Sequence, residues 1–169
     1  MNRFLLTLSV AALLAGCLKN EDNRGTCTFD ECNVKAPAAE IQNVKNYLTQ
    51  NSINAVEHCS GLFYAIDSMG TGISPDVCSG VSVRYKGMLT NGSIFDSTSR
   101  STSPFALRDL VRGWIIGLPK IKQGGGIRLY IPPTLGYGAQ DVTNRATGAV
   151  IIPGNSVLVF EVKLDAVFQ

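Results

Sequence analysis

Residues 83–105, which read VRYKGMLTNGSIFDSTSRSTSPF, contain the side chains whose types first suggest chemistry. Their only acid is Asp96, they include no His or Cys, and their aromatic residues are Tyr85, Phe95 and Phe105. Hydrolysis by general acid and general base catalysis needs more ionisable groups than this segment offers. We therefore expect an aromatic, largely apolar binding surface here and not a hydrolytic centre.

The elements that would position these residues are strands around one short helix. Apolar, aromatic and β-branched residues predict strands at residues 60–67, 80–89, 126–133 and 155–168. Asn91 and Gly92 predict a tight turn, because a two-residue hairpin loop needs positive φ. Residues 108–121 predict a short helix that Gly117 and Pro119 stop. The predicted fold class is therefore an antiparallel α+β domain.

Another helix is expected ahead of this domain. Ile41, Val44 and Leu48 recur at helical spacing, and Glu40 falls in the first turn. We expect residues 40–60 to form a helical N-terminal extension. The sequence leaves open whether this helix packs on the domain.

The N-terminus resembles the signal of a bacterial lipoprotein. Arg3 precedes an apolar run at residues 4–15 that is too short to cross a bilayer but matches the hydrophobic part of a secretory signal. The run ends in LLAGC, which is similar to the lipobox. Residues 1–16 would then be a signal peptide, and Cys17 would carry the lipid, palmitate included, that holds the protein to a membrane. The alternative is a plain signal peptide in which Cys17 is incidental.

A polar segment follows the expected lipid anchor. Residues 17–39 show neither helical nor strand periodicity and are expected to form a flexible tether. Glu21 and Asp22 resemble the signals that send some Bacteroidetes lipoproteins to the cell surface, although a solvated linker is an equal alternative. The expected location is the cell envelope, on the periplasmic face or the outer surface of the outer membrane.

The remaining four cysteines are Cys27, Cys32, Cys59 and Cys78, and an exported protein keeps such residues as disulfides. Four cysteines allow three pairings, and we favour Cys27 with Cys32 and Cys59 with Cys78 because each pair is close in sequence. A metal site is not expected, because CTFDEC lacks the spacing of a zinc knuckle and His58 is the only histidine.

Composition limits the remaining classes of function. The 169 residues, 45% of them hydrophobic, suffice for one ordinary core. A formal net charge of +2 without a long basic run argues against nucleic acid as a partner. GGGIRL at residues 124–129 lacks the Lys-Ser/Thr pair of a phosphate loop. We expect a monomer without a cofactor.

Four ordered segments resemble the FKBP-type peptidyl-prolyl isomerases, over about residues 61–169. YKGMLTNGSIFDST is similar to the family's Y-x-G-x-L-x-x-G-x-x-F-D-S segment, and VRGWIIGL to its V-x-G-W-x-x-G-L segment. YIPPTLGYGA and IIPGNSVLVFEVKL are similar to its later I-P segments. The resemblance implies a curved antiparallel sheet around a short helix, with an aromatic cleft between them.

The resemblance also implies the residues of that cleft. The implied catalytic residues are Tyr85, Phe95, Asp96, Tyr137 and Phe160, and the implied substrate-binding residues are Phe105, Val111, Trp114 and Ile152. Trp114 would form the floor under the proline ring. The Tyr137 hydroxyl and the Val111 N–H would each bind a ligand carbonyl. Asp96 would hold hydrogen-bond geometry beside Tyr85.

The implied reaction is rotation about an X–Pro amide bond, which faces a barrier of about 18–20 kcal/mol and breaks no covalent bond. An apolar pocket that removes water from the carbonyl favours the twisted amide, so aromatic residues would matter more than acids. The implied partners are proline-containing segments of exported proteins and macrolides of the FK506 type. The alternatives are a lipoprotein that binds proline peptides or acts as a chaperone without catalysis, and a scaffold with a vestigial cleft.

Overall fold

The structure is a computed structural model and describes residues 27–100 and 104–169. The expected signal peptide, Cys17, Glu21 and Asp22 lie outside these residues. Within the described ranges, the chain forms a seven-stranded sheet and a separate two-stranded sheet. The larger sheet runs in the order β1-β2-β6-β9-β3-β4, β5 pairs with β3, and every neighbouring pair is antiparallel. The predicted α+β class is confirmed.

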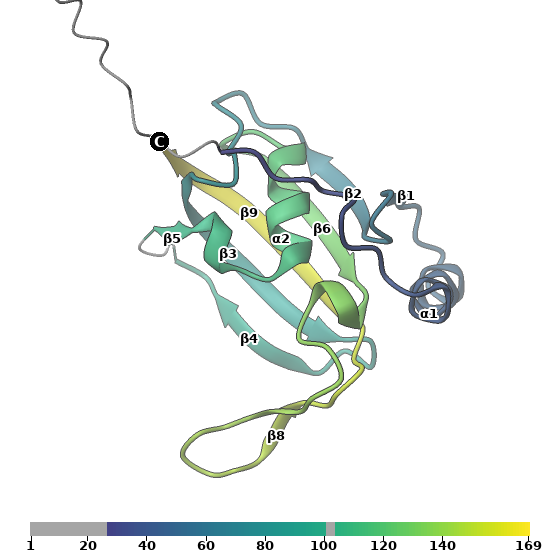
Figure 1. Cartoon of the computed structure of the whole chain (residues 1–169). Coiled ribbons are helices and arrows are strands. Elements are labelled where there is room, and N and C mark those ends of the chain that lie inside the picture. Colours follow the sequence, from purple (N-terminus) through teal and green to yellow (C-terminus); the bar gives the residue numbers. More distant parts are fainter. Residues whose placement is uncertain (1–26, 101–103) are drawn as a thin grey trace, which may run out of the picture.

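The strands of the larger sheet are β1 (Val56–Glu57), β2 (Phe63–Ser68), β3 (Gly80–Leu89), β4 (Ile94–Thr98), β5 (Phe105–Ala106), β6 (Gly126–Ile131) and β9 (Leu158–Phe168). The small sheet pairs β7 (Val142–Thr143) with β8 (Val150–Ile152), and its loop projects away from the larger sheet (Figure 1). The helices are α1 (Ala38–Gln50) and α2 (Arg112–Gly117), with single 3-10 turns at η1 (Leu107–Asp109), η2 (Leu118–Lys120) and η3 (Pro133–Leu135).

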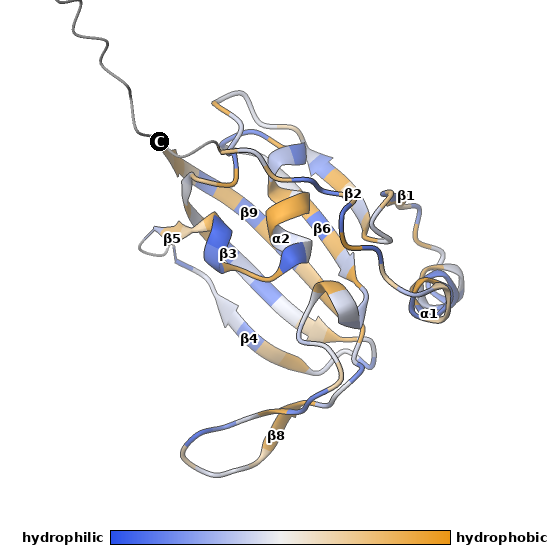
Figure 2. Ribbon diagram, in the orientation of Figure 1, coloured by the Kyte–Doolittle hydropathy of each residue, from blue (hydrophilic) through white to orange (hydrophobic). Residues whose placement is uncertain are grey.

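The main core lies between α2 and one face of the sheet. Because side chains alternate across a strand, Ile127, Leu129 and Ile131 of β6 all point to this face, and all three are fully buried. The middle of α2 is hydrophobic, and β9 shows alternating hydrophilic and hydrophobic bands (Figure 2). This alternation is the signal that predicted the strands, and β3 has the predicted bounds.

The predicted helix at residues 108–121 is wrong in its length, since α2 has six residues. Leu110 and Val111 are extended instead, and the Val111 carbonyl accepts the N–H groups of Trp114 and Ile115 at 2.9 and 3.2 Å. Pro119 has no N–H, so it cannot donate the bond that would continue α2. The short helix leaves room for an extended segment before it, which contributes to the site described below.

A second core lies on the opposite face of the sheet, under α1. Its buried residues are Ala36, Ile41, Val44, Leu48, Phe63, Tyr130, Val157 and Val159. Tyr130 and Val159 alternate along β6 and β9 with residues of the main core, which places α1 and α2 on different faces. The predicted amphipathic helix therefore packs on the domain, with its three spaced apolar residues buried.

The disulfides pair Cys27 with Cys78 and Cys32 with Cys59, so the pairing that sequence proximity favoured is wrong. The bridges span 51 and 27 residues. Proximity is a weak criterion because the entropy of closing a loop grows only slowly with its length. The pairing follows from the path of residues 27–37, which brings Cys27 next to Cys78 and Cys32 next to Cys59.

Residues 27–37 do not form the flexible tether that was expected to reach residue 39. Phe29 and Val34 pack against the main core, and Ala36 is buried. The N–H of Ala36 also donates to the Ser60 carbonyl at 2.9 Å. Residues 27–37 thus belong to the packed structure. Among the described residues, no helix has the length and apolar character needed to cross a membrane.

Candidate active site

A cavity of about 190 Å³ opens between α2 and strands β3, β4 and β9. It is lined by Tyr85, Asp96, Phe105, Leu110, Val111, Trp114, Tyr137 and Phe160. The strands contribute Tyr85, Asp96 and Phe160, whereas Trp114 comes from α2. Seven of the nine sequence-predicted site residues therefore line one cavity, although they are spread from residue 85 to residue 160.

Edge-to-face contacts fix the rings around Trp114. The Trp114 and Phe160 ring centroids lie 5.2 Å apart at 87°, and those of Tyr85 and Trp114 lie 5.4 Å apart at 85°. Aromatic rings prefer such T-shaped contacts, which add about 0.5–1.5 kcal/mol beyond burial. The indole is 5% exposed and its Nε1–H has no hydrogen-bond partner among the described residues. Trp114 therefore forms a rigid apolar floor.

Two predicted residues, Phe95 and Ile152, do not line the cavity. Phe95 packs behind Phe160, with ring centroids 5.4 Å apart at 85°. Ile152 in β8 is buried in the main core. Leu110 lines the cavity although no motif indicated it, and its only signal is its place beside Val111 in the short apolar run that precedes α2.

Gly87 makes this ring arrangement possible and was not predicted as a site residue. It lies opposite Phe160 on one side of β3 and opposite Asp96 on the other. A Cβ at this position would lie 2.7 Å from the Phe95 ring and 2.8 Å from the Phe160 ring. The family motif contains this glycine, but only the structure reveals that two rings occupy the space of its missing side chain.

The polar groups of the cavity are hydroxyls and one carboxylate. The Tyr85 hydroxyl donates to Asp96 Oδ2 at 2.7 Å. Burial raises the pKa of Tyr85 well above its ordinary value, and the hydrogen bond to Asp96 raises it further. Burial, with the nearby Asp96 charge, also raises the pKa of Tyr137. Both hydroxyls are therefore protonated at neutral pH and can donate.

Besides the buried Nε1–H of Trp114, other donors of the lining residues have no acceptor among the described residues. The Tyr137 side chain is 46% exposed, and its hydroxyl forms no hydrogen bond with a described residue. The N–H of Val111, which precedes the first turn of α2, likewise has no acceptor among the described residues. The cavity thus combines an apolar floor with donors suited to the carbonyl oxygens of a bound ligand.

A larger hollow of about 590 Å³ lies elsewhere, between α1 and the turns after β3 and β8. Its lining is mostly Asn, Gln, Ser and Thr, and Tyr47 is its only aromatic residue. Size alone would favour this hollow. We assign the site to the smaller cavity, because it is the one that brings together an apolar floor, a carboxylate and unpaired donors.

Two groups of side chains have the proximity of metal ligands, namely Cys32, His58 and Cys59, and Cys27, Asp76 and Cys78. In both groups the two sulfur atoms are joined in a disulfide. A disulfide removes the thiolates that a zinc ion would bind. Neither group lines the aromatic cavity.

Residues 73–165 match the family described as FKBP-type peptidyl-prolyl cis-trans isomerase. The chain is 42% identical over 108 residues to the FKBP-type peptidyl-prolyl cis-trans isomerase FkpA of Buchnera aphidicola subsp. Schizaphis graminum, which covers 62% of this chain and 40% of that protein. FkpA of Escherichia coli K12 is 41% identical over 107 residues, with 62% of this chain and 37% of that protein covered. The chain thus spans about two fifths of the length of these curated relatives.

Solved structures agree with the sequence comparison. A peptidyl-prolyl cis-trans isomerase from Pseudomonas syringae pv. tomato superposes with a TM-score of 0.65 at 30% identity, covering 80% of this chain and 99% of that one. FkpA from Escherichia coli also gives a TM-score of 0.65, at 34% identity, covering 78% of this chain and 61% of that one. The fold, the cavity and the matched segment together lead to one assignment: the chain belongs to the FKBP-type peptidyl-prolyl cis-trans isomerase family.

Proposed function

We propose that the protein is a peptidyl-prolyl cis-trans isomerase that acts on X–Pro bonds of exported or envelope proteins and so assists their folding. The observation that carries the proposal is the apolar Trp114 floor beside the open donors of Val111 and Tyr137. A proline ring fits an apolar floor, and the carbonyls that flank it need donors. Family membership supports the same reaction.

The proposed mechanism relies on differential binding of the twisted amide. When an X–Pro bond rotates, the nitrogen leaves conjugation and the carbonyl loses charge, so the twisted state tolerates an apolar pocket better than the planar state does. The edges of Tyr85 and Phe160 would surround that carbonyl, and Phe95 would hold Phe160 in place. No group of the protein has to accept or donate a proton to the substrate.

Magnitudes support this mechanism. Lowering the barrier by about 5 kcal/mol would accelerate rotation several thousandfold, since each tenfold gain needs about 1.4 kcal/mol. One desolvated carbonyl and two or three hydrogen bonds of about 1 kcal/mol each are sufficient. Tyr137 and the Val111 N–H would provide two of these bonds. Asp96 would orient the Tyr85 hydroxyl, to which it is bonded at 2.7 Å.

The proposed location is the cell envelope, with a lipid at Cys17 as the membrane anchor. The lipobox-like sequence supports the anchor, and the two disulfides support an oxidising compartment outside the cytoplasm. The proposed partners are proline-containing polypeptides and macrolides of the FK506 type, and the proposed oligomeric state is a monomer. The domain boundary at residue 61 also remains part of the proposal.

The test is the cis-to-trans exchange rate of an X–Pro peptide, measured by NMR. Wild-type protein should accelerate exchange, and the double variant Tyr137→Phe with Asp96→Leu should lose most of the acceleration while remaining folded. Tyr47→Phe removes a hydroxyl outside the cavity and is the matched control. If wild type binds the peptide without accelerating exchange, the protein is a recognition module and the proposal is wrong.

A further inference from the structure

Residues 27–50, here called the extension, lie before the family segment of residues 73–165 but contact the elements that form its cleft. The extension begins beside α2 and ends as α1, which packs on the other face of the sheet (Figure 1). It therefore passes around the domain and has polar contacts with η3 and with η2, which lie next to cavity-lining residues in the chain.

The first contact lies on the Tyr137 side. Both carboxylate oxygens of Glu40, in the first turn of α1, accept hydrogen bonds from Thr134: Oε2 from its N–H and Oε1 from its hydroxyl, each at 2.8 Å. Thr134 is the middle residue of η3, which precedes Tyr137 by two residues. A carboxylate that accepts two bonds from one residue fixes both its position and its orientation.

Backbone hydrogen bonds join the turn that carries Tyr137 to η3. The N–H groups of Gly136 and Gly138, on either side of Tyr137, both donate to the Pro133 carbonyl at 2.9 Å. Glycines leave a backbone free to move unless such bonds hold it. Thr134 and Pro133 of η3 therefore connect Glu40 of α1 with the backbone turn that carries Tyr137.

The second contact lies on the Trp114 side. Lys120, the last residue of η2, donates to Glu31 Oε2 at 2.6 Å, and the Arg112 guanidinium, at the start of α2, lies 6.0 Å from the centre of the Phe29 ring. The extension thus holds both ends of the continuous α2–η2 segment. Trp114 lies within that segment, between these two contacts.

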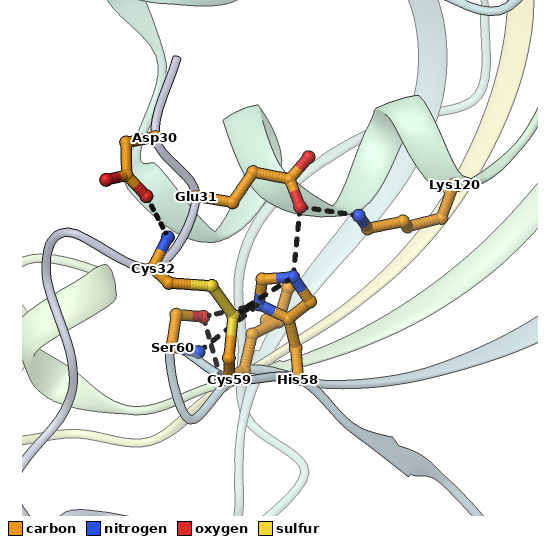
Figure 3. Close-up of polar contacts among 8 residues, drawn as sticks. Asp30, Glu31, Cys32, His58, Cys59, Ser60 and Lys120 are labelled. Carbon is orange, nitrogen blue, oxygen red and sulfur yellow. Dashed lines mark hydrogen bonds and ion pairs between the residues drawn. A yellow bond between two sulfur atoms is a disulfide. The ribbon is translucent and has the colours of Figure 1, made fainter.

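Glu31 is itself held in place. The same Oε2 atom lies 3.0 Å from His58 Nε2, and His58 Nδ1 lies 3.0 Å from the hydroxyl of the buried Ser60 (Figure 3). The Cys32–Cys59 disulfide joins the neighbours of Glu31 and His58 covalently. Glu31 therefore has a defined position from which to orient Lys120.

We propose that the extension positions the two sides of the isomerase cleft, with Glu40 fixing Tyr137 through Thr134, and with Phe29 and Glu31 fixing Trp114 through α2 and η2. Glu40, Phe29 and Glu31 are positioning residues, because none of them lines the cavity. The proposal rests on the proposed isomerase function. Its physical basis is that a displacement of about 1 Å in a binding group lowers catalysis by up to about a hundredfold.

The experiment on the Tyr137 side compares three variants of the purified protein. Glu40→Ala removes both bonds to Thr134 and should lower kcat/KM for an X–Pro peptide about tenfold. Glu40→Gln should retain most activity, because its amide can accept from the N–H and donate to the hydroxyl oxygen of Thr134. Glu57→Ala is the matched control, since it breaks the 2.9 Å ion pair between Lys45 of α1 and β1 away from the cleft.

A merely structural role predicts a different pattern. If Glu40→Ala and Glu57→Ala lower the melting temperature similarly and leave kcat/KM equally unchanged, the proposal is overturned on the Tyr137 side. The same conclusion follows if Glu40→Gln loses as much activity as Glu40→Ala while the melting temperature stays high. Loss in Glu40→Ala, rescue in Glu40→Gln and full activity in Glu57→Ala support it.

The experiment on the Trp114 side uses fluorescence, because Trp114 is the only tryptophan of the chain. Phe29→Ala with Glu31→Gln should shift the Trp114 emission to longer wavelength and raise its quenching by acrylamide in the folded protein, because the buried indole gains contact with water. Glu57→Ala should leave the spectrum unchanged. An unchanged spectrum in the double variant overturns the proposal on this side.

Failure of the proposed function and failure of this inference give different results. Wild-type protein that does not accelerate exchange overturns the proposed function. The positioning role is then read from Trp114 fluorescence and from the NMR signals of the Tyr137 ring, which should shift in Glu40→Ala and not in Glu57→Ala. Wild-type protein that is active, with variants that change neither activity nor these signals, overturns the inference alone.

Discussion

The cleft and the extension satisfy their polar groups in opposite ways. In the cleft, Tyr85 is paired with Asp96, whereas the Tyr137 hydroxyl and the Val111 N–H have no partner among the described residues. In the extension, Glu31 lies against both His58 and Lys120, and Glu40 takes two bonds from Thr134. The unpaired donors lie in the cavity where a ligand would bind. The paired carboxylates lie outside it, in contact with η2 and η3.

This difference indicates how a small domain keeps a shallow cavity ordered. Unpaired donors can point into a cavity only if the backbone that carries them is held by other contacts. The extension supplies such contacts from outside the family segment, through two disulfides and through the contacts of Glu31 with His58 and Lys120.

The largest effect should come from opening the extension. Replacing Cys32 and Cys59 together by Ser removes a bridge across 27 residues, which should lower the free energy of unfolding by about 3.5 kcal/mol. Urea denaturation monitored by circular dichroism measures this loss. The Cys27 and Cys78 double variant, whose bridge spans 51 residues, should lose about 4 kcal/mol. Unchanged midpoints in both variants would contradict a stabilising extension.

A smaller loss should follow from filling the space beside the cleft rings. Gly87→Ala introduces a Cβ within 2.8 Å of the Phe95 and Phe160 rings and should lower stability by about 1–3 kcal/mol. It should also weaken binding of an X–Pro peptide, because Phe160 lines the cavity. Thermal denaturation and peptide titration check both effects. Gly80→Ala in the same strand is the matched control, since its Cβ would have ordinary contacts at 3.4 Å or more.

Removing the internal hydrogen bond of the cleft should cost less. Tyr85→Phe loses the 2.7 Å bond to Asp96, and we expect a stability loss of about 1 kcal/mol, because water can solvate the exposed carboxylate in its place. Peptide affinity should fall severalfold, because the cavity loses the hydroxyl that Asp96 orients. Titration calorimetry measures the affinity, with Tyr47→Phe as the control for a lost hydroxyl. A Tyr85→Phe variant with wild-type affinity and turnover would remove Asp96 and Tyr85 from the mechanism.

The smallest effect should come from pH. Because folding raises the pKa of Tyr85 and Tyr137, the stability linked to both hydroxyls is fully present below their ordinary value of 10 and is lost as pH rises through the folded values. Isomerase activity and stability should therefore stay flat between neutral pH and about 10. Absorbance titration of tyrosinate should show late-ionising groups, one fewer in Tyr85→Phe. A fall in activity between pH 8 and 9 that Tyr85→Phe abolishes would contradict this assignment.

The cleft was more predictable from sequence than the extension. Trp114, Tyr137 and Phe160 could be named in advance because each belongs to a motif whose spacing repeats across a family, and the structure brings all three to one cavity. Phe95 and Ile152 were named in the same way, yet one supports a ring from behind and the other lies in the core. A motif indicates that a residue lies near the site, but it does not indicate whether the side chain lines the cavity or packs behind a residue that does.

The contacts of the extension could not be predicted from the sequence. Polar residues without periodicity predicted a tether, and sequence proximity predicted the wrong disulfides. Nothing local to Glu31 or Glu40 indicates Lys120 or Thr134 as partners, because those pairs are 89 and 94 residues apart. Such contacts depend on the path of the whole chain around the sheet.

Local sequence patterns were sufficient to predict strands β2, β3, β6 and β9, the amphipathic α1 and the aromatic residues of the cleft, because alternation, helical spacing and motif order are properties of neighbouring residues. Tertiary packing sets the cysteine pairing and the contacts of the extension with η2 and η3. Each of these arises where segments far apart in sequence meet. Their geometry follows from packing and from the saturation of polar groups, which no local pattern encodes.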